Sequence, residues 1–215
     1  MVSNEQQEQY ISSLILPRPS LIEEMEQYAK KNDVPIMELV GIESLLQLLR
    51  VKQPKSILEV GTAIGYSSIR MADALPETRI VTIEKDEERY TTAIENIKKA
   101  GLAHRITAVL GDANELHDDI KQHGPFDVIF IDAAKGQYQK FFDAYTEMLS
   151  SKGMVITDNV MFRGYVADEE GLESRRLRSL VKKIRAFNEY IMNHDGFHSS
   201  LLPIGDGMMV SIKRN

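Results

Sequence analysis

Carboxylate and amide side chains follow the apolar runs of this sequence, at the points where the runs end. Such runs are typical of buried parallel strands, and open α/β sheets bind ligands beyond the carboxyl ends of their strands. Many acids at one rim are costly unless positive charge offsets them. The sequence therefore predicts a site that receives a cationic ligand or ion. The side chains concerned are Glu59, Glu84, Asp112, Asp132, Asp158 and Asn159.

Asp132, Asp158 and Asn159 offer only oxygen donors and come from neighbouring strand ends. Two carboxylates and an amide oxygen suit a hard cation such as Mg²⁺, which keeps several waters and leaves positions open for substrate oxygens. Taken singly, Asp132 is better explained as the cap of the next helix, and Asp158-Asn159 as a turn. Together at one rim, the three side chains favour a metal site.

Lys135 follows Asp132 closely and is expected over the same pocket. A lysine beside a divalent cation in a partly desolvated site is favoured in its neutral form, which can act as a general base. Without a metal, a lone lysine at this point would be an ordinary surface charge. The catalytic role of Lys135 therefore depends on the metal.

The stretch 56–68 has the pattern of a strand, a glycine turn and the start of a helix. Gly61 permits backbone conformations closed to other residues, and the helix that follows offers free N–H groups to a ligand. A dinucleotide fingerprint would have a glycine where Ala63 stands. Glu59 would repel a pyrophosphate, but it suits a ligand that carries an ammonium group.

Glu84 ends the next strand, where it is placed to accept hydrogen bonds from both hydroxyls of a ribose. Asp112 follows a glycine and is placed to meet an adenine amino group. Combined with Glu59, these acids favour S-adenosylmethionine over NAD. The alternative is an ordinary strand–helix turn with solvated acids.

The composition favours one α/β domain over residues 1–215, since 43% hydrophobic and 27% charged residues are ordinary for a globular protein. The absence of cysteine excludes disulfides, thiolate metal sites and cysteine nucleophiles. No apolar run approaches the length of a membrane span, and the first nine residues do not resemble a secretory signal. We therefore expect a cytoplasmic protein without membrane contact.

Helical spacing of apolar residues predicts three N-terminal helices within residues 1–50, at 5–16, 20–31 and 35–50. In the second helix, Ser20 and Glu23 have the spacing of a capping box. These helices precede the first strand, so they are expected to form a lid, an oligomer face or simply a cover for one side of the sheet.

Residues 56–213 alternate between predicted strands and helices, which indicates a doubly wound, mostly parallel sheet of seven strands. A long helix is expected over 172–192. The turn residues Gly205-Asp206-Gly207 then join two strands directly, so the chain is expected to end in a hairpin with one antiparallel strand. The predicted strands are 57–60, 79–83, 105–110, 126–131, 153–157, 198–204 and 208–213.

The predicted helix 172–192 has a basic face opposite its apolar face. Such a face is usually only solvated charge, but it also suits contacts with phosphates. The formal net charge of −6 argues against a large non-specific grip on nucleic acid, yet not against a local basic surface. Arg18 and Arg163 are expected to flank the pocket and to extend such a surface. The basic residues of the helix are Arg175, Arg176, Arg178, Lys182, Lys183 and Arg185.

Several of these motifs together resemble the cation-dependent O-methyltransferases, which include the catechol and caffeoyl-CoA O-methyltransferases. The resemblance implies a Rossmann-like methyltransferase fold, metal ligation by Asp132, Asp158 and Asn159, and Lys135 as the base. It further implies homodimers, which are common in the family. The motifs are 59-EVGTAIGYS-67, 83-IE-84, 111-GDA-113, 130-FIDAAK-135, 158-DNV-160 and 202-LPIGDG-207. The S-adenosylmethionine contacts implied by the resemblance are Met37, Gly61, Ser67, Glu84, Asp112, Ala113 and Asp132.

Within this family, the segments 16-LPRP-19 and 34-VPIME-38 and the arginine-rich late helix are similar to bacterial tRNA 5-hydroxyuridine methyltransferases. Those enzymes make 5-methoxyuridine at the wobble position of tRNA. The narrower resemblance implies a Mg²⁺-dependent enzyme that acts on tRNA, with Arg18, Arg163, Arg175, Arg176 and Arg178 as tRNA contacts. A small catechol-like phenol as the substrate of the same site, and a nucleotide-binding module without catalysis, are the alternatives.

Overall fold

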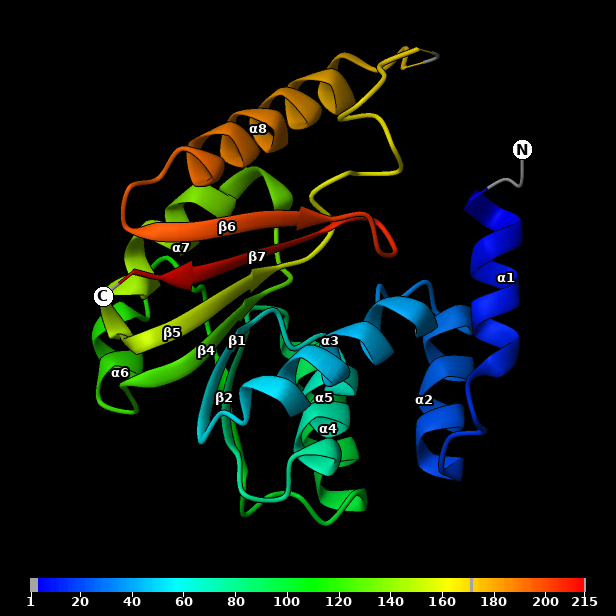
Figure 1. Ribbon diagram of the computed structural model, residues 1–215. Coiled ribbons are helices and arrows are strands. Elements are labelled where there is room, and N and C mark those ends of the chain that lie inside the picture. Colours follow the sequence, from blue (N-terminus) through cyan, green and yellow to red (C-terminus); the bar gives the residue numbers. More distant parts are fainter. Residues whose placement is uncertain (1–3, 171, 215) are drawn as a thin grey trace.

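The centre of the chain is a seven-stranded sheet with the strand order β3-β2-β1-β4-β5-β7-β6. The computed structural model describes residues 4–170 and 172–214, and Figure 1 shows the sheet between two groups of helices. Neighbouring strands from β3 to β5 are parallel, while β7 runs antiparallel to both β5 and β6. The predicted fold class is confirmed, including the C-terminal hairpin. The strands are β1 (Ser56–Val60), β2 (Arg79–Glu84), β3 (Ile106–Leu110), β4 (Phe126–Ile131), β5 (Leu149–Thr157), β6 (Phe197–Leu202) and β7 (Met208–Lys213).

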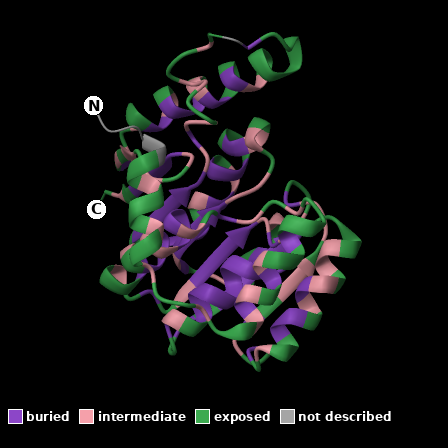
Figure 2. Cartoon of the chain, turned by 90° about the vertical axis from the view of Figure 1, so that its right-hand side faces the viewer, coloured by how far each residue is buried: buried purple, intermediate pink, exposed green. Residues whose placement is uncertain are grey.

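Helices cover both faces of the sheet because successive strand residues point to opposite faces and both sets are apolar. One core cluster packs Ile57 and Ile80 with α2 to α5, and the other packs Leu58 and Ile129 with α6 to α8. Figure 2 shows the buried strands between helices that turn their exposed faces outward. The helices are α1 (Asn4–Leu14), α2 (Ser20–Lys31), α3 (Leu39–Lys52), α4 (Tyr66–Ala74), α5 (Glu87–Lys99), α6 (His117–Lys121), α7 (Tyr138–Tyr145) and α8 (Arg175–Met192), with short 3-10 turns η1 (Lys135–Gln137) and η2 (Thr146–Met148).

The N-terminal helices differ from the sequence prediction at two points. Ser20 does not cap α2: the carbonyl of Pro19 accepts the first helical N–H groups, so Ser20 is already inside the helix. Helix α3 begins at Leu39, because Glu38 has extended backbone angles. The segment 35–38, predicted as helix, instead lines the pocket described below.

Helix α8 begins at Arg175, later than predicted, because the Ser174 side chain accepts the N–H of Leu177 and caps it. Leu172 is buried outside the helix. Within the described part of the chain, no helix is both long and apolar enough to cross a membrane.

Candidate active site

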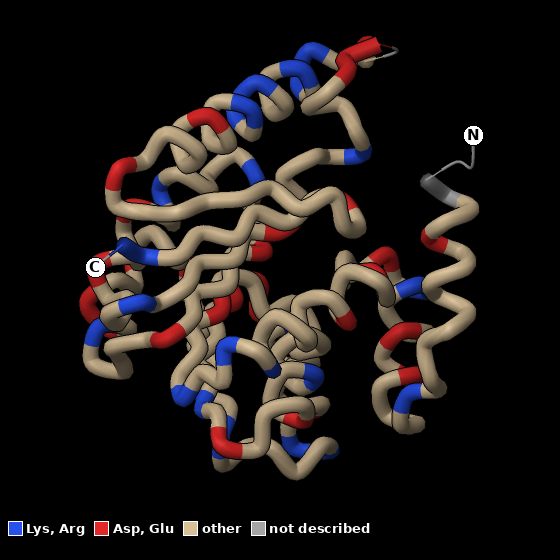
Figure 3. The backbone as a smooth tube through the Cα atoms, in the orientation of Figure 1, with Lys and Arg blue, Asp and Glu red and all other residues tan. Residues whose placement is uncertain are grey.

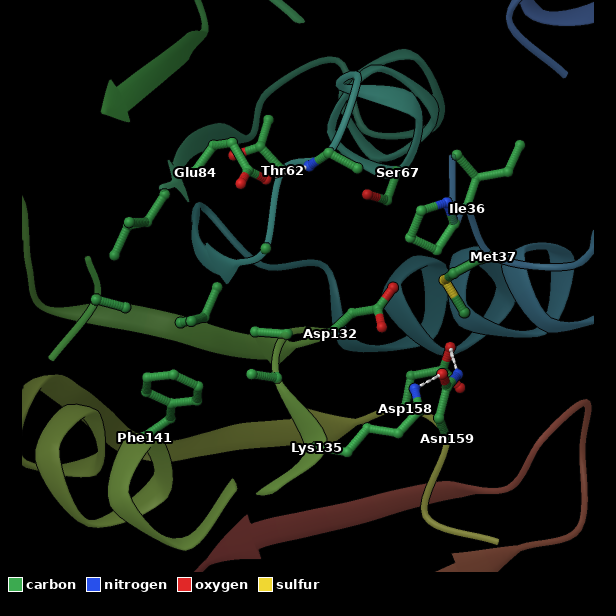
Figure 4. A pocket seen from close by; sticks show the side chains of 18 of the residues that line it. Ile36, Met37, Thr62, Ser67, Glu84, Asp132, Lys135, Phe141, Asp158 and Asn159 are labelled. Carbon is green, nitrogen blue, oxygen red and sulfur yellow. Dashed lines mark hydrogen bonds between the residues drawn. The ribbon is translucent and has the colours of Figure 1, made fainter. Parts of the chain in front are cut away.

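A pocket of about 790 Å³ opens at the carboxyl ends of the parallel strands. This is where an open α/β sheet binds its ligands, and the volume is in the usual range for small-molecule sites. Figure 4 shows Glu84, Thr62 and Ser67 on one wall, facing Asp132, Lys135, Asp158 and Asn159 on the other. The predicted site residues that line the pocket are Met37, Gly61, Ser67, Glu84, Asp112, Ala113, Asp132, Lys135, Asp158, Asn159 and Arg163.

Gly61 allows a close backbone approach at the centre of the pocket. Its φ angle is +108°, and a Cβ at this position would lie only 2.0 Å from the backbone oxygen of Asp132. The Asp132 N–H in turn donates to the carbonyl of Val60 at 2.9 Å. Only a glycine therefore lets the ends of β1 and β4 approach so closely, and the approach brings Asp132 beside the glycine turn.

Glu59 does not line the pocket, so the expected direct contact with a ligand's ammonium group is corrected. Its side chain is fully buried and accepts hydrogen bonds from the hydroxyls of Ser67, Ser68 and Thr82. Burial raises the pKa of Glu59 to about 7, although the three hydroxyls act in the opposite direction. Glu59 instead fixes Ser67, whose oxygen lines the pocket and has its proton directed toward Glu59.

Glu84 lies on the pocket wall with its carboxylate held by the backbone. Oε2 accepts the N–H of Ala63 at 2.8 Å, and Oε1 accepts the N–H groups of Lys85 and Asp86, both at 2.9 Å. A carboxylate has about four acceptor positions, so one position on Oε2 stays open to a hydroxyl donor. The position and fixed orientation of Glu84 fit a contact with one ribose hydroxyl, whereas the sequence predicted contacts with both.

Asp112 and Ala113 form the end of the pocket beside β3. Asp112 Oδ1 accepts both the backbone N–H and the side-chain amide of Asn114, and these bonds lower the pKa of the Asp112 carboxyl. The Asn114 amide also donates to Gln137 Oε1 at 2.8 Å. The loop is therefore tied to η1, which carries Lys135. We call Glu59, Glu84 and Asp112 the cofactor half of the site.

Asp132, Lys135, Asp158 and Asn159 make up the other half, which we call the cation half. The Asn159 amide donates to Asp158 Oδ2 at 2.7 Å, and the Lys135 ammonium donates to Asn159 Oδ1. Burial and the neighbouring carboxylate of Asp132 together raise the pKa of Asp158 to about 7. Burial likewise raises the pKa of Asp132, which Lys135 opposes.

The donor chemistry of the cation half fits a hard divalent cation. Two neighbouring carboxylates, Asp158 buried and Asp132 half-buried, favour any positive charge between them, and all three ligand candidates offer oxygen. In residues 4–170 and 172–214, no three His, Cys, Asp or Glu side chains are grouped as metal ligands. A cation here would therefore need the amide oxygen of Asn159 together with waters or substrate oxygens. Lys135, which now contacts that amide oxygen, would have to give it up.

Comparison with known proteins decides the family. The model of the O-methyltransferase family matches residues 11–214. The chain belongs to the O-methyltransferase family.

A catechol O-methyltransferase of Niastella koreensis is 35% identical over 176 residues, which cover 78% of this chain and 77% of the relative. A Staphylococcus aureus structure, proposed to be a caffeoyl-CoA O-methyltransferase, superposes with a TM-score of 0.91 at 36% identity over 97% of this chain and 99% of that one. An O-methyltransferase of Bacillus cereus, solved with S-adenosylhomocysteine (SAH), has a TM-score of 0.83 at 29% identity over 96% of each chain. A non-catalytic binding module, one of the alternatives left by the sequence, is thereby excluded.

The outer lip of the O-methyltransferase pocket includes residues that the sequence analysis did not single out. Phe162 lies beside Arg163, and the lip is completed by Glu38, just before α3, and by Asp206 in the β6–β7 turn. Asp206 accepts the backbone N–H of Arg163. The signal for Asp206 was the glycine-flanked turn of the terminal hairpin. Glu38 was hidden because its segment was predicted as helix.

The fold places some of the predicted basic residues at the pocket and others away from it. Arg18 lies outside the pocket and pairs with Glu26 at 2.7 Å, and Glu26 accepts the hydroxyl of Tyr66 at 2.8 Å. Arg185 is also engaged, because it pairs with Glu169 at 2.8 Å. Arg163 lines the pocket, whereas Arg175, Arg176 and Arg178 do not; they are exposed on α8.

One basic residue of α8 nevertheless lies beside the 3-10 turn that carries Lys135. Figure 3 shows the row of Lys and Arg positions along α8. Among the described residues, the only ion pair on this helix is that of Arg185. A Cβ on Gly136 would lie 3.9 Å from the Lys183 ammonium, so Lys183 lies beside η1, which also carries Lys135.

Proposed function

We propose that this O-methyltransferase takes its methyl group from S-adenosylmethionine and, with Mg²⁺ in the cation half, methylates 5-hydroxyuridine in tRNA to 5-methoxyuridine at the wobble position. The observation that carries the chemistry is the meeting of Lys135, Asp132, Asp158 and Asn159 at one wall of a pocket whose other wall presents Glu84. The SAH bound to the Bacillus cereus relative supports the cofactor.

In the cofactor half, different residues of this chain would contact different parts of the ligand. Glu84 would accept a ribose hydroxyl, and Asp112 has its second carboxylate oxygen left for an adenine amino group. Ser67, whose proton is turned toward Glu59, would accept from the ammonium group. The carboxylate of Glu59 thus supports the positive ligand through Ser67 without touching it.

In the cation half, Asp132, Asp158 and Asn159 would hold the divalent cation. That cation supplies Lewis-acid chemistry, which lowers the pKa of an acceptor hydroxyl. Lys135 Nζ lies beside Asn159 and, as the neutral amine that a bound divalent cation would favour, would take up the proton of that hydroxyl. The acceptor oxygen then forms a bond to the methyl carbon as the bond from carbon to the sulfonium sulfur breaks, leaving the thioether SAH.

The substrate class follows from two features of the chain. A 5-hydroxyuracil and a catechol each offer two adjacent oxygens, so the cation half serves either one. The basic face of α8, whose Lys183 lies beside Gly136, favours the nucleic acid, because phosphate contacts dominate tRNA affinity. A small phenol, the substrate named for the catechol relative, would make no use of that face.

The experiment that tests the proposal is mass spectrometry of tRNA nucleosides from a strain that lacks this protein. We expect 5-methoxyuridine to disappear and 5-hydroxyuridine to accumulate. Purified protein with S-adenosylmethionine and Mg²⁺ should then methylate that tRNA. Unchanged 5-methoxyuridine in the deletion strain would contradict the tRNA assignment and leave the phenol as the substrate.

The role of α8 is tested by replacing Arg175, Arg176 and Arg178 with glutamine. We expect tRNA methylation to fall at least about tenfold at physiological salt, because each lost phosphate contact weakens binding, while methylation of free catechol stays unchanged. A triple variant of Arg79, Lys98 and Lys99, exposed at the opposite end of β2 and α5, removes the same charge as a control. Equal losses in both variants would refute a specific role for α8.

We also propose that the protein is a homodimer. Tyr10 and Leu14 on α1 are 66% and 63% exposed, and the neighbouring Leu16 is 80% exposed. A second copy would bury such an apolar surface. Light scattering that gives the mass of one chain at micromolar concentration would contradict the dimer.

A further inference from the structure

The turn that carries Asn159 has an unusual backbone. Asn159 has a φ angle of +59°, in the left-handed region that side-chain-bearing residues rarely adopt. Such conformations persist only where the surroundings hold them, and they cluster at functional sites. Contacts with neighbouring elements must therefore hold this turn.

Two buried side chains donate hydrogen bonds to the carbonyl groups of the residues on either side of Asn159. The Tyr138 hydroxyl on α7 donates to the Asp158 carbonyl at 2.8 Å. The Asn188 amide on α8 donates to the Val160 carbonyl, also at 2.8 Å. These bonds fix the peptide groups that begin at Asp158 and at Val160, so the turn through Asn159 is held on both sides.

The buried position of Asn188 is energetically unfavourable for its amide oxygen. Its side chain is 7% exposed, and its Oδ1 has no hydrogen-bond partner among the described residues. A buried acceptor without a partner is destabilising, and a leucine of similar shape would avoid it. Packing alone therefore does not explain an asparagine here. Its bond to the Val160 carbonyl does.

We propose that Tyr138 and Asn188 are positioning residues for the cation site. They hold the left-handed turn so that the Asn159 amide oxygen faces Lys135 and the Asn159 amide nitrogen meets Asp158. Residues behind the ligands of a metal typically fix ligand orientation and thereby affinity. The inference rests on the proposed function, since that function includes the divalent cation.

The variants are Tyr138→Phe and Asn188→Leu, each of which keeps the shape of the side chain and removes the hydrogen bond. Tyr145→Phe is the matched control. Tyr145 lies on the same helix, is also buried, and donates its hydroxyl to the Ala113 carbonyl at 2.7 Å, on the cofactor side. It therefore reports what the loss of a buried tyrosine hydroxyl from α7 does to the site in general.

Three quantities are measured on the full chain without a methyl acceptor: Mn²⁺ affinity by electron paramagnetic resonance, SAH affinity by calorimetry, and the melting temperature. We expect Tyr138→Phe and Asn188→Leu to weaken Mn²⁺ binding about tenfold or more. Their SAH affinity should stay within about twofold of the wild type, the scatter expected of an uninvolved site. Tyr145→Phe should weaken SAH binding and leave Mn²⁺ binding intact.

Wild-type protein that binds no Mn²⁺ would refute the proposed cation and with it the basis of the inference. Wild-type binding with equal Mn²⁺ affinity in Tyr138→Phe and Asn188→Leu would overturn the inference alone. Parallel loss of Mn²⁺ affinity, SAH affinity and melting temperature would also overturn it, because that pattern indicates a merely structural role. If one of the two variants does not fold, the other decides by the same criteria.

Discussion

The two halves of the site treat their carboxylates in opposite ways. In the cofactor half, Glu59 is enclosed by three hydroxyls and Glu84 by three backbone N–H groups. In the cation half, the charge of Asp132 disfavours the ionised form of Asp158, and the Lys135 ammonium favours the ionised form of both carboxyls. The chain thus completes one half with its own donors and leaves the other dependent on added positive charge. In the proposed function, the first half holds the cofactor and the second receives the divalent cation.

The largest expected effect comes from Asp158→Ala, which removes a carboxylate from the cation half only. Turnover should fall by about 1,000-fold or more, because a Lewis acid contributes several kcal/mol to such a reaction. Affinity for S-adenosylmethionine should fall little, since the cofactor half is untouched. Steady-state kinetics and calorimetry measure the two effects, and a large loss of cofactor affinity would show that the halves are not separate.

Lys135→Met tests the proton transfer in the same half. Loss of a general base typically costs 10² to 10⁴-fold, so kcat should drop by about that factor. Divalent-cation affinity should hold or improve, because the ammonium that contacts Asn159 Oδ1 is removed. Should cation affinity collapse with kcat, Lys135 would be part of the cation's support instead of its competitor. Calorimetric titration with Mg²⁺ separates the two roles.

The smallest effect is the pH dependence of stability. Asp158 and Glu59 both have pKa values raised to about 7 in the folded chain, above the usual carboxyl range of the unfolded chain. The folded state therefore holds more protons, and the stability from these groups, complete below about pH 4, is lost as the pH rises through about 7.

In EDTA we thus expect the melting temperature to fall between pH 5 and 8, by about 2–4 °C for each kcal/mol lost. Saturating Mg²⁺ should remove the part due to Asp158 but not the part due to Glu59, which lies in the cofactor half. Differential scanning calorimetry measures both curves. A melting temperature that rises over this range in EDTA would contradict the assignment, as would identical curves with and without Mg²⁺.

The sequence located the site because strand ends are easy to find: an apolar run that stops at an acid predicts both the strand and the rim. It also predicted the antiparallel hairpin from the short turn before Met208. The direction in which a side chain points at the end of a strand is harder to predict. Glu59 was expected to face a ligand, but the hydroxyls that enclose it come from α4 and β2, and only the folded sheet brings them to one point.

Contacts across distant elements were also beyond the sequence. Asn188 and Tyr138 are ordinary residues of amphipathic helices until the fold places them on either side of Asn159. Glu38 was missed for a local reason, since the apolar periodicity of α3 extends to residues before the true start of the helix. Periodicity detects a helix well, but the backbone angles at its first turn decide where it begins.

The most direct test of the central claim is methyl transfer by metal-free protein, titrated with Mg²⁺. The amount of product is measured with both tRNA containing 5-hydroxyuridine and a simple catechol as acceptors. The account predicts no transfer to either acceptor in EDTA and a saturable return of activity as Mg²⁺ is added. Equal activity with and without EDTA would contradict it.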